Sequence, residues 1–272
     1  NMGGPQVNNT QLLLAGNIDF ATGYSLKTLN AVNEELPLVT VGAFFQRDPQ
    51  SLVVHEGQGI DGLEDLKGRP IKIPTAGRVA YWPWLVAEYG FKDDQLRPYE
   101  YSYRAFAQNE ALAQQGYITN DGYFLKQHGI QAKSLHLADY GWNAYSATLD
   151  TKRSTIEERP DLVRKFLAAS IEGWKAYLDD PGPGNELIKQ ANAEQTDGLI
   201  EYSIAAMRRH EILTAGGARG GSHIGMMTSG RWQSFYEKMV DAGTLRADLD
   251  YKNGYTLRFL EQIYPEAMAG GD

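Results

Sequence analysis

The sequence has 272 residues, of which 42% are hydrophobic, so it can bury one or two sizeable cores. Its net charge of −8 and its lack of a Lys/Arg run argue against nucleic acid or an anionic membrane surface as a partner. The absence of cysteine excludes a disulfide framework, a thiolate metal site and a cysteine nucleophile.

No apolar run approaches the ~18 residues of a membrane span, and no signal peptide is visible.

The first segment with a clear pattern predicts a helix that Asn9 or Thr10 caps and Gly16 closes. A short strand is expected at residues 18–20, followed by a loop over residues 21–25.

A second segment has the same order about a hundred residues later. It predicts a helix through Ala111 and Leu112 that stops at Gly116, a strand at residues 117–119 and a polar loop at 120–123. Strands that alternate with helices indicate an α/β sheet, and two such units predict two similar lobes. The expected lobes comprise residues 1–55 with 146–272, and residues 56–145. Further strands are expected at residues 39–45, 51–55, 69–74, 97–101 and 134–137.

From residue 151 onward, long helices dominate the predicted structure. The segment after Pro160 places Phe166, Trp174 and Tyr177 on one helical face, at a spacing that favours plain core packing. Two further amphipathic helices follow, one of them capped by Thr228 and ended by Gly243. Residues 179–186 are expected to form an interhelical turn.

The sequence does not assemble a catalytic or metal site. None of the five histidines has a partner residue at metal-ligand spacing, and no Gly-x-Ser-x-Gly nucleophile turn is present. The Gly-rich segment 216–225 lacks the ending of a phosphate-binding loop, so a mobile loop or lid is expected there. No cofactor is therefore expected.

The remaining candidates are loops at strand ends that carry aromatic rings and small polar groups. Ligands of open α/β sheets lie beyond the carboxyl ends of strands, and aromatic walls with a few hydrogen-bonding groups suit a flat ring. Phe44 and Trp84 are expected only to pack the lobes. The candidate ligand-binding residues are Thr22, Tyr24, Gln46, Thr75, Arg78, Tyr81, Trp82, Thr119, Asn120, Asp121, Tyr123 and Trp142.

Six segments together carry a resemblance to a known family. They are LLLAGNIDFATG, FFQRDPQSLVVHEGQGIDGLEDLKGRPIKIP, QQGYITNDGYFLKQHGI, ADYGWNAYSATL, IEERPDLVRKFLAASIEGWKAYL and GRWQSFYEKMVDAGTLRADLDYKNGYT. In this order they resemble the substrate-binding proteins of bacterial ABC importers, in the group related to thiamine-pyrimidine-precursor binding and to pyrimidine synthase. The resemblance covers nearly the whole chain.

The resemblance implies a two-lobed periplasmic-binding-protein fold of type II, with a ligand cleft between the lobes. It also implies an exported, extracytoplasmic monomer that delivers a small molecule to an ABC permease. The sequence departs from the family pattern twice. An earlier strand with its Asp-Trp loop is not seen, and Asn120-Asp121-Gly122 replaces the usual Asn-Glu-Pro or Ser-Glu-Pro.

Three functions are compatible with this resemblance. The first is transport, in which the two lobes close on a ligand that the permease then receives. The second is an enzyme like pyrimidine synthase, which uses pyridoxal phosphate, iron and a sacrificed histidine; those enzymes carry a Cys-rich motif that is missing here. The third is a sensor domain that uses the same cleft. We expect transport and no catalysis.

The residues of these loops leave two classes of ligand to compare, a flat aromatic ring and a small oxyanion. A thiamine pyrimidine precursor or riboflavin-like ring fits the aromatic loops, whereas a sulfonate or nitrate would need bare N–H groups with few rings. Asp121 is expected at the cleft mouth as the acceptor for a donor group of the ligand, with Arg78 nearby either to keep it ionised or to bind the ligand itself. The alternative is that Asp121 only caps the following helix.

Overall fold

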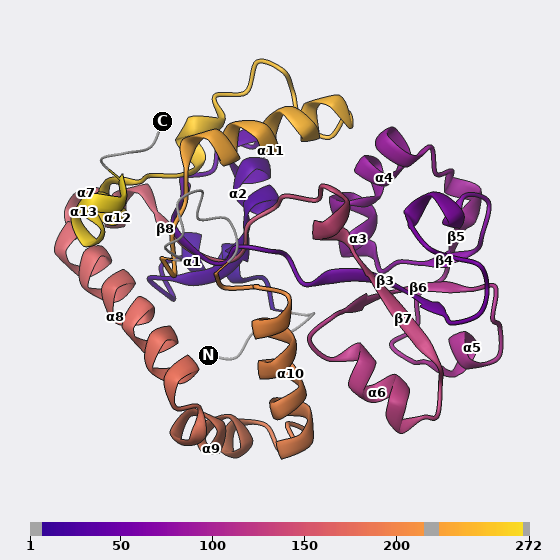
Figure 1. Cartoon of the computed structure of the whole chain (residues 1–272). Coiled ribbons are helices and arrows are strands. Elements are labelled where there is room, and N and C mark those ends of the chain that lie inside the picture. The colour runs from indigo at the N-terminus through magenta and orange to yellow at the C-terminus, as the bar shows by residue number, and fades with distance from the viewer. Residues whose placement is uncertain (1–6, 215–222, 269–272) are drawn as a thin grey trace.

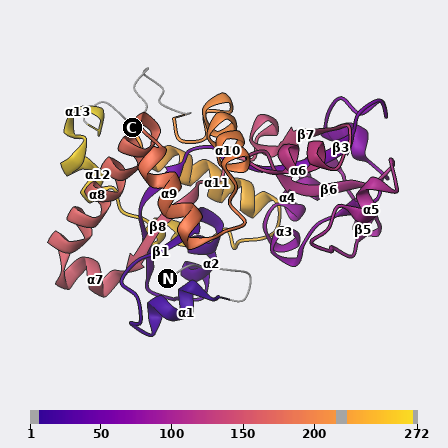
Figure 2. The same ribbon diagram turned by 90° about the horizontal axis from the view of Figure 1, so that it is seen from below.

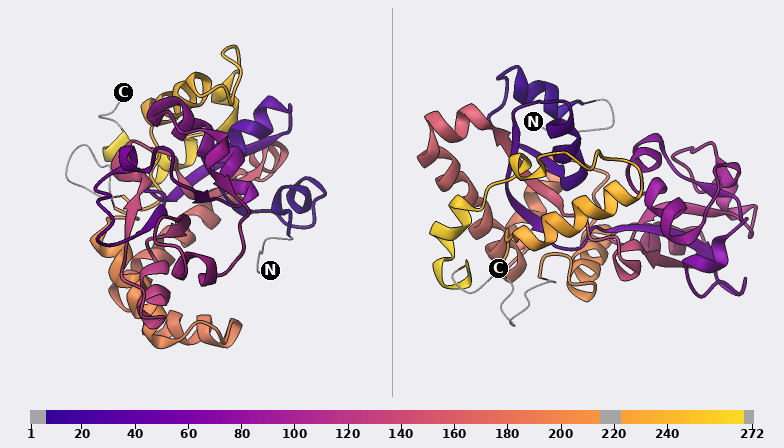
Figure 3. Two further views of the ribbon diagram at one scale, coloured as in Figure 1. Left: turned by 90° about the vertical axis from the view of Figure 1, so that its right-hand side faces the viewer. Right: turned by 90° about the horizontal axis from the view of Figure 1, so that it is seen from above.

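The computed structural model of the chain describes residues 7–214 and 223–268. It is a mixed α/β structure with two sheets, each in its own lobe, and helices around both (Figure 1). The first lobe contains the three-stranded sheet, and the second lobe contains the five-stranded sheet. Views from below and from above show the second lobe projecting from the first, which carries the long C-terminal helices (Figure 2 and Figure 3, right).

The three-stranded sheet has the order β1-β8-β2. Its strands are β1 (Ala21–Tyr24), β8 (Ser146–Lys152) and β2 (Leu38–Phe45), and β8 runs antiparallel to both neighbours. Almost every residue of β2 is buried, as expected for a strand covered on both faces. β1 is an edge strand, so one side of its backbone is not paired within this sheet.

The five-stranded sheet has the order β5-β4-β6-β3-β7. β4 is parallel to β5 and β6, whereas β3 is antiparallel to β6 and β7. Four strands therefore end at the same edge of the sheet. The bounds are β3 (Gln50–His55), β4 (Ile71–Lys72), β5 (Leu96–Arg97), β6 (Ala113–Tyr117) and β7 (Ala132–His136).

Helices cover both sheets, and four short 3-10 helices lie in the connections. The α-helices are α1 (Asn9–Leu14), α2 (Ser25–Asn33), α3 (Thr75–Ala80), α4 (Trp82–Tyr89), α5 (Arg104–Ala107), α6 (Asp121–Gln127), α7 (Arg153–Glu158), α8 (Pro160–Asp179), α9 (Gly182–Ala191), α10 (Asp197–Arg209), α11 (Ser229–Asp241), α12 (Arg258–Ile263) and α13 (Pro265–Met268). The 3-10 helices are η1 (Leu63–Leu66), η2 (Asp93–Gln95), η3 (Leu137–Tyr140) and η4 (Tyr251–Gly254).

The chain crosses between the lobes twice. Residues 46–49 connect β2 to β3, and residues 137–145 connect β7 to β8. Trp142 lies in the second crossing and packs against Trp84 of α4, with ring centroids 5.4 Å apart, and against Phe235 of α11, at 5.3 Å. One aromatic ring therefore links both lobes at the crossing. The expected first boundary at 55/56 lies several residues too late, because residues 50–55, expected in the first lobe, form β3 of the second lobe's sheet. The expected second boundary at 145/146 agrees with the start of β8 at Ser146.

The capping expectations for the C-terminal helices are confirmed. The hydroxyl of Thr228 accepts from the N–H of Arg231 at 3.3 Å, and Gly243 follows α11 with a φ of 70°. Pro160 occupies the first position of α8, where its missing N–H costs no helical hydrogen bond. At the other end of the chain, α1 is capped by Asn8, whose Oδ1 accepts from the N–H of Gln11, and not by Asn9 or Thr10.

Two local expectations are wrong by several residues. The strand expected at 18–20 is β1 at Ala21–Tyr24, so most of the loop expected at 21–25 is strand. The helix expected before Gly116 is strand β6, and that strand ends at Tyr117 and not at Thr119. Its Ala and Gln residues favour helix, but hydrogen bonds to β3 and β4 on both sides override this preference.

Gly116 therefore does not end a helix. It lies inside β6, where a Cβ would be 2.7 Å from both the Asp121 carboxylate oxygen Oδ2 and the Val53 side chain. A glycine at this position allows the carboxylate of Asp121 to approach the strand. The Gly-rich segment, expected to be a lid, lies outside the described residues from 216 to 222.

Candidate functional site

The candidate site lies where strand ends from both sheets face the two crossings. β4, β5, β6 and β7 run in one direction, and β1 and β2 of the other sheet share a direction relative to β8. Ligands of open sheets bind beyond such carboxyl ends. The segments that follow these ends contain Tyr24, Gln46, Thr75, Tyr99, Asp121 and Trp142.

Four tyrosines lie in the segments at and after these ends, and we call them the cleft tyrosines: Tyr24, Tyr81, Tyr99 and Tyr117. Of these, Tyr81 is buried at the junction of α3 and α4. Tyr24 ends β1 and is 41% exposed; Tyr117 ends β6 and is 40% exposed. Burial, followed by the charge of Asp48, raises the pKa of Tyr117 to about 12, and the pKa also responds to Tyr24 and Asp121. Burial and Asp121 likewise raise the pKa of Tyr99 to about 12.

These pKa values have two consequences. The tyrosines keep neutral hydroxyls at pH 7, which can donate and accept hydrogen bonds. The charge of Asp48 also raises the pKa of both Tyr24 of the first lobe and Tyr117 of the second, so both side chains lie near the first crossing. Gln50 lies beside them, because its Nε2 donates to the hydroxyl of Tyr117 at 3.4 Å and its Oε1 accepts from Gln115 Nε2 at 2.9 Å.

Two polar atoms of the predicted set are buried without a hydrogen-bond partner. They are the hydroxyl of Tyr81 and the Oδ1 of Asn120. Buried polar groups are normally paired, so unpaired ones need an explanation. Asn120 occupies the position before α6, yet its side chain makes no capping hydrogen bond. Both atoms are therefore buried donors or acceptors that no group of the described residues satisfies.

Asp121, by contrast, already has protein partners. Its side chain accepts hydrogen bonds from the hydroxyl of Tyr103 and from the N–H of Tyr117, and the residue is 7% exposed. Burial raises the pKa of this carboxyl, while the hydrogen bonds from Tyr103 and Tyr117 oppose the shift. The carboxylate thus braces the end of β6 against residue 103. Its contact with a ligand remains a prediction.

Other predicted residues use their polar groups to hold local structure. Arg78 donates through Nε to the carbonyl of Ile73 at 2.9 Å and through Nη2 to that of Arg97 at 2.8 Å, and not to Asp121 as expected. Gln46 donates to the carbonyls of Ala43 and Met226 at 2.7 and 2.8 Å. In the same lobe as Arg78, Trp82 donates to Asp93 at 2.8 Å, and Thr75 lies exposed at the start of α3.

Trp142 and Asp48 connect the two crossings. The indole N–H of Trp142 donates to Oδ2 of Asp48 at 3.1 Å, and the N–H of Gln50 donates to Oδ1 at 3.1 Å. Burial raises the pKa of the Asp48 carboxyl to about 6, although these two hydrogen bonds favour its charged form. The carbonyl of Asp48 also accepts from Nε2 of His136 at 2.7 Å. Trp142 thus has a structural contact here in addition to its predicted binding role.

Thr119 and Tyr123 contact α10. The hydroxyl of Ser203 donates to the carbonyl of Thr119 at 2.8 Å, and the ring of Tyr123 lies 6.1 Å from that of Tyr202. This side of the cleft is therefore occupied by a helix that packs on the first lobe.

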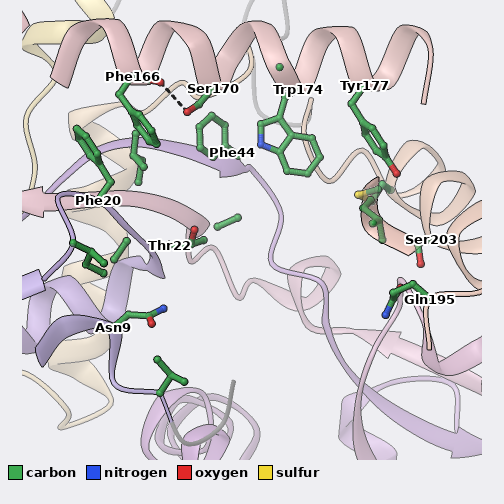
Figure 4. Close-up of a pocket in the computed structure, with 18 of the residues that line it drawn as sticks. Asn9, Phe20, Thr22, Phe44, Phe166, Ser170, Trp174, Tyr177, Gln195 and Ser203 are labelled. Atoms are coloured by element: carbon green, nitrogen blue, oxygen red, sulfur yellow. Dashed lines mark hydrogen bonds between the residues drawn. The ribbon is translucent and has the colours of Figure 1, made fainter. Parts of the chain in front are cut away.

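A large pocket of about 870 Å³ lies between α8, β1, β8, α1 and α10 (Figure 4). Of the predicted site residues, Thr22 lines it. The aromatic side chains of α8, expected to be core, also line it: Phe166 is 42% exposed and stacks on Phe20 with centroids 4.2 Å apart. They face this space because no layer of the described chain covers that face of α8. Phe44 and Trp84 are buried as expected, although Phe44 also borders the pocket.

A smaller pocket of about 320 Å³ lies between the lobes. Its walls come from α1 and α2 on one side and from Ala76, Val79 and Ala80 of α3 on the other, with Tyr24 at its border. Tyr24 is thus the predicted residue that contacts a space between lobes directly.

Sequence reasoning missed several tyrosines near the site: Tyr99, Tyr101, Tyr103 and Tyr117. The first three alternate in the segment YEYSY, which follows strand β5. That alternation directly after a strand was the available signal. This signal was missed because Tyr99 and Tyr101 were expected to belong to a strand at residues 97–101.

Comparison with known proteins decides the family. The family model described as NMT1/THI5 like matches residues 1–183. The chain belongs to this NMT1/THI5-like family. The family resemblance seen in the sequence is thereby confirmed.

A similar curated protein is the riboflavin-binding protein RibY of Chloroflexus aurantiacus. It is 24% identical over 248 residues, which cover 89% of this chain and 70% of RibY. Among solved structures, the periplasmic aliphatic sulphonate-binding protein SsuA of Escherichia coli matches with a TM-score of 0.66 and 15% identity, over 89% of this chain and 77% of SsuA. The desulfurization enzyme DSZB matches with a TM-score of 0.59 and 14% identity, over 89% of this chain and 84% of DSZB.

These structures confirm the periplasmic-binding-protein fold, which proteins named for binding and a protein named as an enzyme share. Within residues 7–214 and 223–268, the structure contains no cluster of three metal-ligating side chains. In the same residues, no helix has the length and apolar character needed to span a membrane.

Proposed function

We propose that this NMT1/THI5-like protein is an extracytoplasmic solute-binding protein of an ABC importer, which captures a flat aromatic heterocycle and delivers it to the permease. The cleft tyrosines carry the proposal, because they bring aromatic surface and neutral hydroxyls from both lobes to the strand ends. The relationship to a riboflavin-binding protein supports a flavin-like ring, with a thiamine pyrimidine precursor as the next candidate.

A sulfonate or nitrate ligand is less well supported by the contacts at the cleft. An oxyanion needs cationic or N–H donors that are free to receive it. The guanidinium groups of Arg78 and Arg231, which lie near the strand ends and crossings, donate to backbone carbonyls. The guanidinium of Arg47 in the first crossing is paired with Asp139, and its buried Nε has no partner among the described residues. The sulphonate-binding neighbours support the fold and leave the ligand open at 15% identity.

The large pocket is a competing place for the ligand. Its walls between Phe20, Phe166 and Leu149 are mainly apolar, whereas a heterocycle with ring nitrogens and carbonyls also needs hydrogen-bonding partners. The strand ends offer these partners in the hydroxyls of Tyr24 and Tyr117, which are 41% and 40% exposed. We therefore place the ligand at the strand ends.

The experiment is a ligand panel on the purified chain, with riboflavin, a hydroxymethylpyrimidine and an alkylsulfonate. A ligand present at a hundred times its Kd stabilises the folded protein by about 2.7 kcal/mol, which raises the melting temperature. Riboflavin or the pyrimidine should cause this rise. A rise with the sulfonate alone, or with no member of the panel, would overturn the proposed ligand class.

Matched variants locate the ligand. Tyr117→Ala should weaken binding of the best ligand about ten- to a hundredfold, because ring stacking is worth about 1–3 kcal/mol. Tyr117→Phe keeps the ring and should bind within a few-fold of the parent. Phe166→Ala and Tyr177→Ala change side chains that line the large pocket, although Tyr177 also donates to Asn185 of α9, and both should leave affinity unchanged. Loss of binding in these two variants and not in Tyr117→Ala would move the site to the large pocket.

A further inference from the structure

Helices α6 and α10 meet through two reciprocal pairs of a glycine and a tyrosine. Tyr202 of α10 lies against Gly122 of α6: a Cβ on Gly122 would overlap the hydroxyl of Tyr202 and lie 3.1 Å from its Cζ. Tyr123 of α6 lies against Gly198 of α10, where a Cβ would be 3.0 Å from the hydroxyl of Tyr123. We call these four residues the Gly–Tyr interlock.

The glycines of the interlock serve close approach and not backbone conformation. Neither Gly122 nor Gly198 has a positive φ, so an L-residue could adopt either backbone conformation. Gly198 and Tyr202 are four residues apart and share one face of α10. The two tyrosine rings lie 6.1 Å apart between the helices. Each helix therefore presents a ring to the partner's glycine.

α10 is anchored in the first lobe. Ile200 and Ile204 pack in one apolar cluster with Trp174 of α8, and Arg208 donates to the carbonyl of Leu178 at 2.5 Å. The chain just after α10 reaches the first crossing, where the carbonyl of Ile212 accepts from the N–H of Gln46 at 2.6 Å.

α6 belongs to the second lobe, because it directly follows strand β6 of the five-stranded sheet. Two further contacts accompany the interlock. Ile118 joins the apolar cluster of Ile200 and Ile204, and Ser203 donates to the carbonyl of Thr119 at 2.8 Å. On the other side of the crossings in Figure 1, α11 approaches α4, with Lys238 3.8 Å from Glu88.

We propose that the Gly–Tyr interlock is a latch between the lobes that fixes their resting separation in the ligand-free protein. Opening of the lobes on this side separates α6 from α10 and breaks the interlock. This inference does not depend on the ligand proposed above, because it rests only on contacts between residues of the chain. It predicts that a small steric change at Gly122 opens the lobes without altering the residues of the two crossings.

Gly122→Ala is the direct test, and Gly230→Ala is its matched control. Both glycines are the second residue of a helix, and neither has a positive φ. A Cβ on Gly230 meets nothing within 4 Å, whereas one on Gly122 meets Tyr202. Since Ala favours a helix over Gly by about 1 kcal/mol at both sites, the difference between the variants reports the overlap with Tyr202.

The measurement uses the absence of native cysteine. Spin labels on Lys126→Cys of α6 and Lys165→Cys of α8, both exposed, report the distance between the lobes without any ligand. Gly122→Ala should lengthen and broaden this distance, while Gly230→Ala should match the parent. Adding Tyr202→Phe, which removes the overlapping hydroxyl, should return the Gly122→Ala protein toward the parental distance.

Two results would overturn the latch. One is a folded Gly122→Ala protein whose label distance equals that of Gly230→Ala. The other applies if Gly122→Ala does not fold: Tyr202→Ala removes the ring without adding atoms, and an unchanged distance in that variant rejects the proposal. Because no ligand is added, failure of the proposed ligand class leaves this result unaffected, and the reverse also holds.

Discussion

The indole N–H of Trp142 donates to the carboxylate of Asp48 at 3.1 Å, and this contact joins the two segments that cross between the lobes. Asp48 is buried, and its carboxyl has a pKa raised to about 6. Hinge segments absorb the backbone changes of lobe closure, so their hydrogen bonds restrict the motion. The charged form of Asp48 depends on donors from both crossings.

Trp142→Phe should therefore destabilise the protein in a pH-dependent manner. The change removes a donor to the ionised carboxylate, which costs about 1–3 kcal/mol when Asp48 is charged. Below pH 6 Asp48 is mostly protonated and needs this donor less. Urea unfolding at pH 5 and pH 7.5 should show the larger loss at pH 7.5.

Trp84→Phe provides the control for Trp142→Phe. Trp84 is equally buried in the same aromatic cluster, but its indole N–H has no hydrogen-bond partner. The stability lost in Trp84→Phe should therefore be the same at pH 5 and at pH 7.5. Equal pH dependence in both variants would mean that the Trp142–Asp48 hydrogen bond does not stabilise the charged carboxylate.

Asp150 on β8 gives a second pH prediction. Its carboxyl is buried beside Thr40, which donates to it at 2.7 Å, and burial raises its pKa from 3.8 to about 6. A raised pKa for an acid means that its contribution to stability is full below pH ~4 and is lost as the pH rises through about 6. The loss amounts to about 3 kcal/mol.

Asp150→Asn should remove this loss. An amide oxygen can still accept from Thr40, and no charge has to be buried at neutral pH. Relative to the parent, the variant should become more stable between pH 4 and pH 7.5, by up to about 3 kcal/mol. Asp179→Asn is the control, because Asp179 is exposed at the end of α8. A difference from the parent that stays constant with pH would contradict the prediction.

Tyr103 and Asp121 should act as a coupled pair. The Tyr103 hydroxyl donates to the buried carboxylate of Asp121, which also accepts from the N–H of Tyr117. Tyr103→Phe and Asp121→Asn should each reduce the free energy of unfolding, and the double variant should lose less than the sum by about 1–2 kcal/mol. Additive losses measured by urea unfolding would show that the two side chains do not interact.

The same variants also test whether the Asp121 carboxylate only holds the end of β6 in place or contacts the ligand as well. If the carboxylate also accepts from the ligand, Asp121→Asn should reduce affinity about ten- to a hundredfold, whereas Tyr103→Phe should affect affinity little. Titration calorimetry with the best ligand of the panel distinguishes the cases. Equal affinities in the parent and both variants would leave Asp121 as a structural residue.

Much of the fold could be read from the sequence because its signals are local. The Thr228 cap and the apolar face of α11 depend on neighbouring residues, and the structure contains both. Strand β8 was not predicted, because its buried Asp150 and Thr148 look like surface residues in an isolated segment. Only pairing with β1 and β2 explains their burial.

The site was harder to read because its contacts are long-range. Asp121 follows a strand as expected, yet its partner Tyr103 is 18 residues away, and a loop sequence does not specify such a pairing. Arg78 had the right charge to pair with Asp121, but the carbonyls of Ile73 and Arg97 occupy its guanidinium. Sequence identifies which residue types lie at strand ends, whereas packing decides which of their groups stay available.

Arg231 supplies the last prediction, because it binds both crossings from α11. Its guanidinium donates to the carbonyl of Gln46 in the first crossing, and to those of Asn143 at 2.9 Å and Ala144 at 3.1 Å in the second. It also lies 4.0 Å from the ring centre of Tyr145. A planar fork of donors can reach three carbonyls, whereas the ammonium of lysine cannot reproduce this geometry.

Arg231→Lys should therefore lower the free energy of unfolding by about 1.5–3 kcal/mol, the value of hydrogen bonds to a charged group. Arg246→Lys is the control, since Arg246 is exposed, donates through Nε to Oδ1 of Asn33 at 3.0 Å and forms an exposed ion pair with Asp248 at 3.8 Å. This exposed change should stay within about 0.5 kcal/mol of the parent. Equal losses in the two lysine variants would show that the contacts of Arg231 with the crossings do not stabilise the fold.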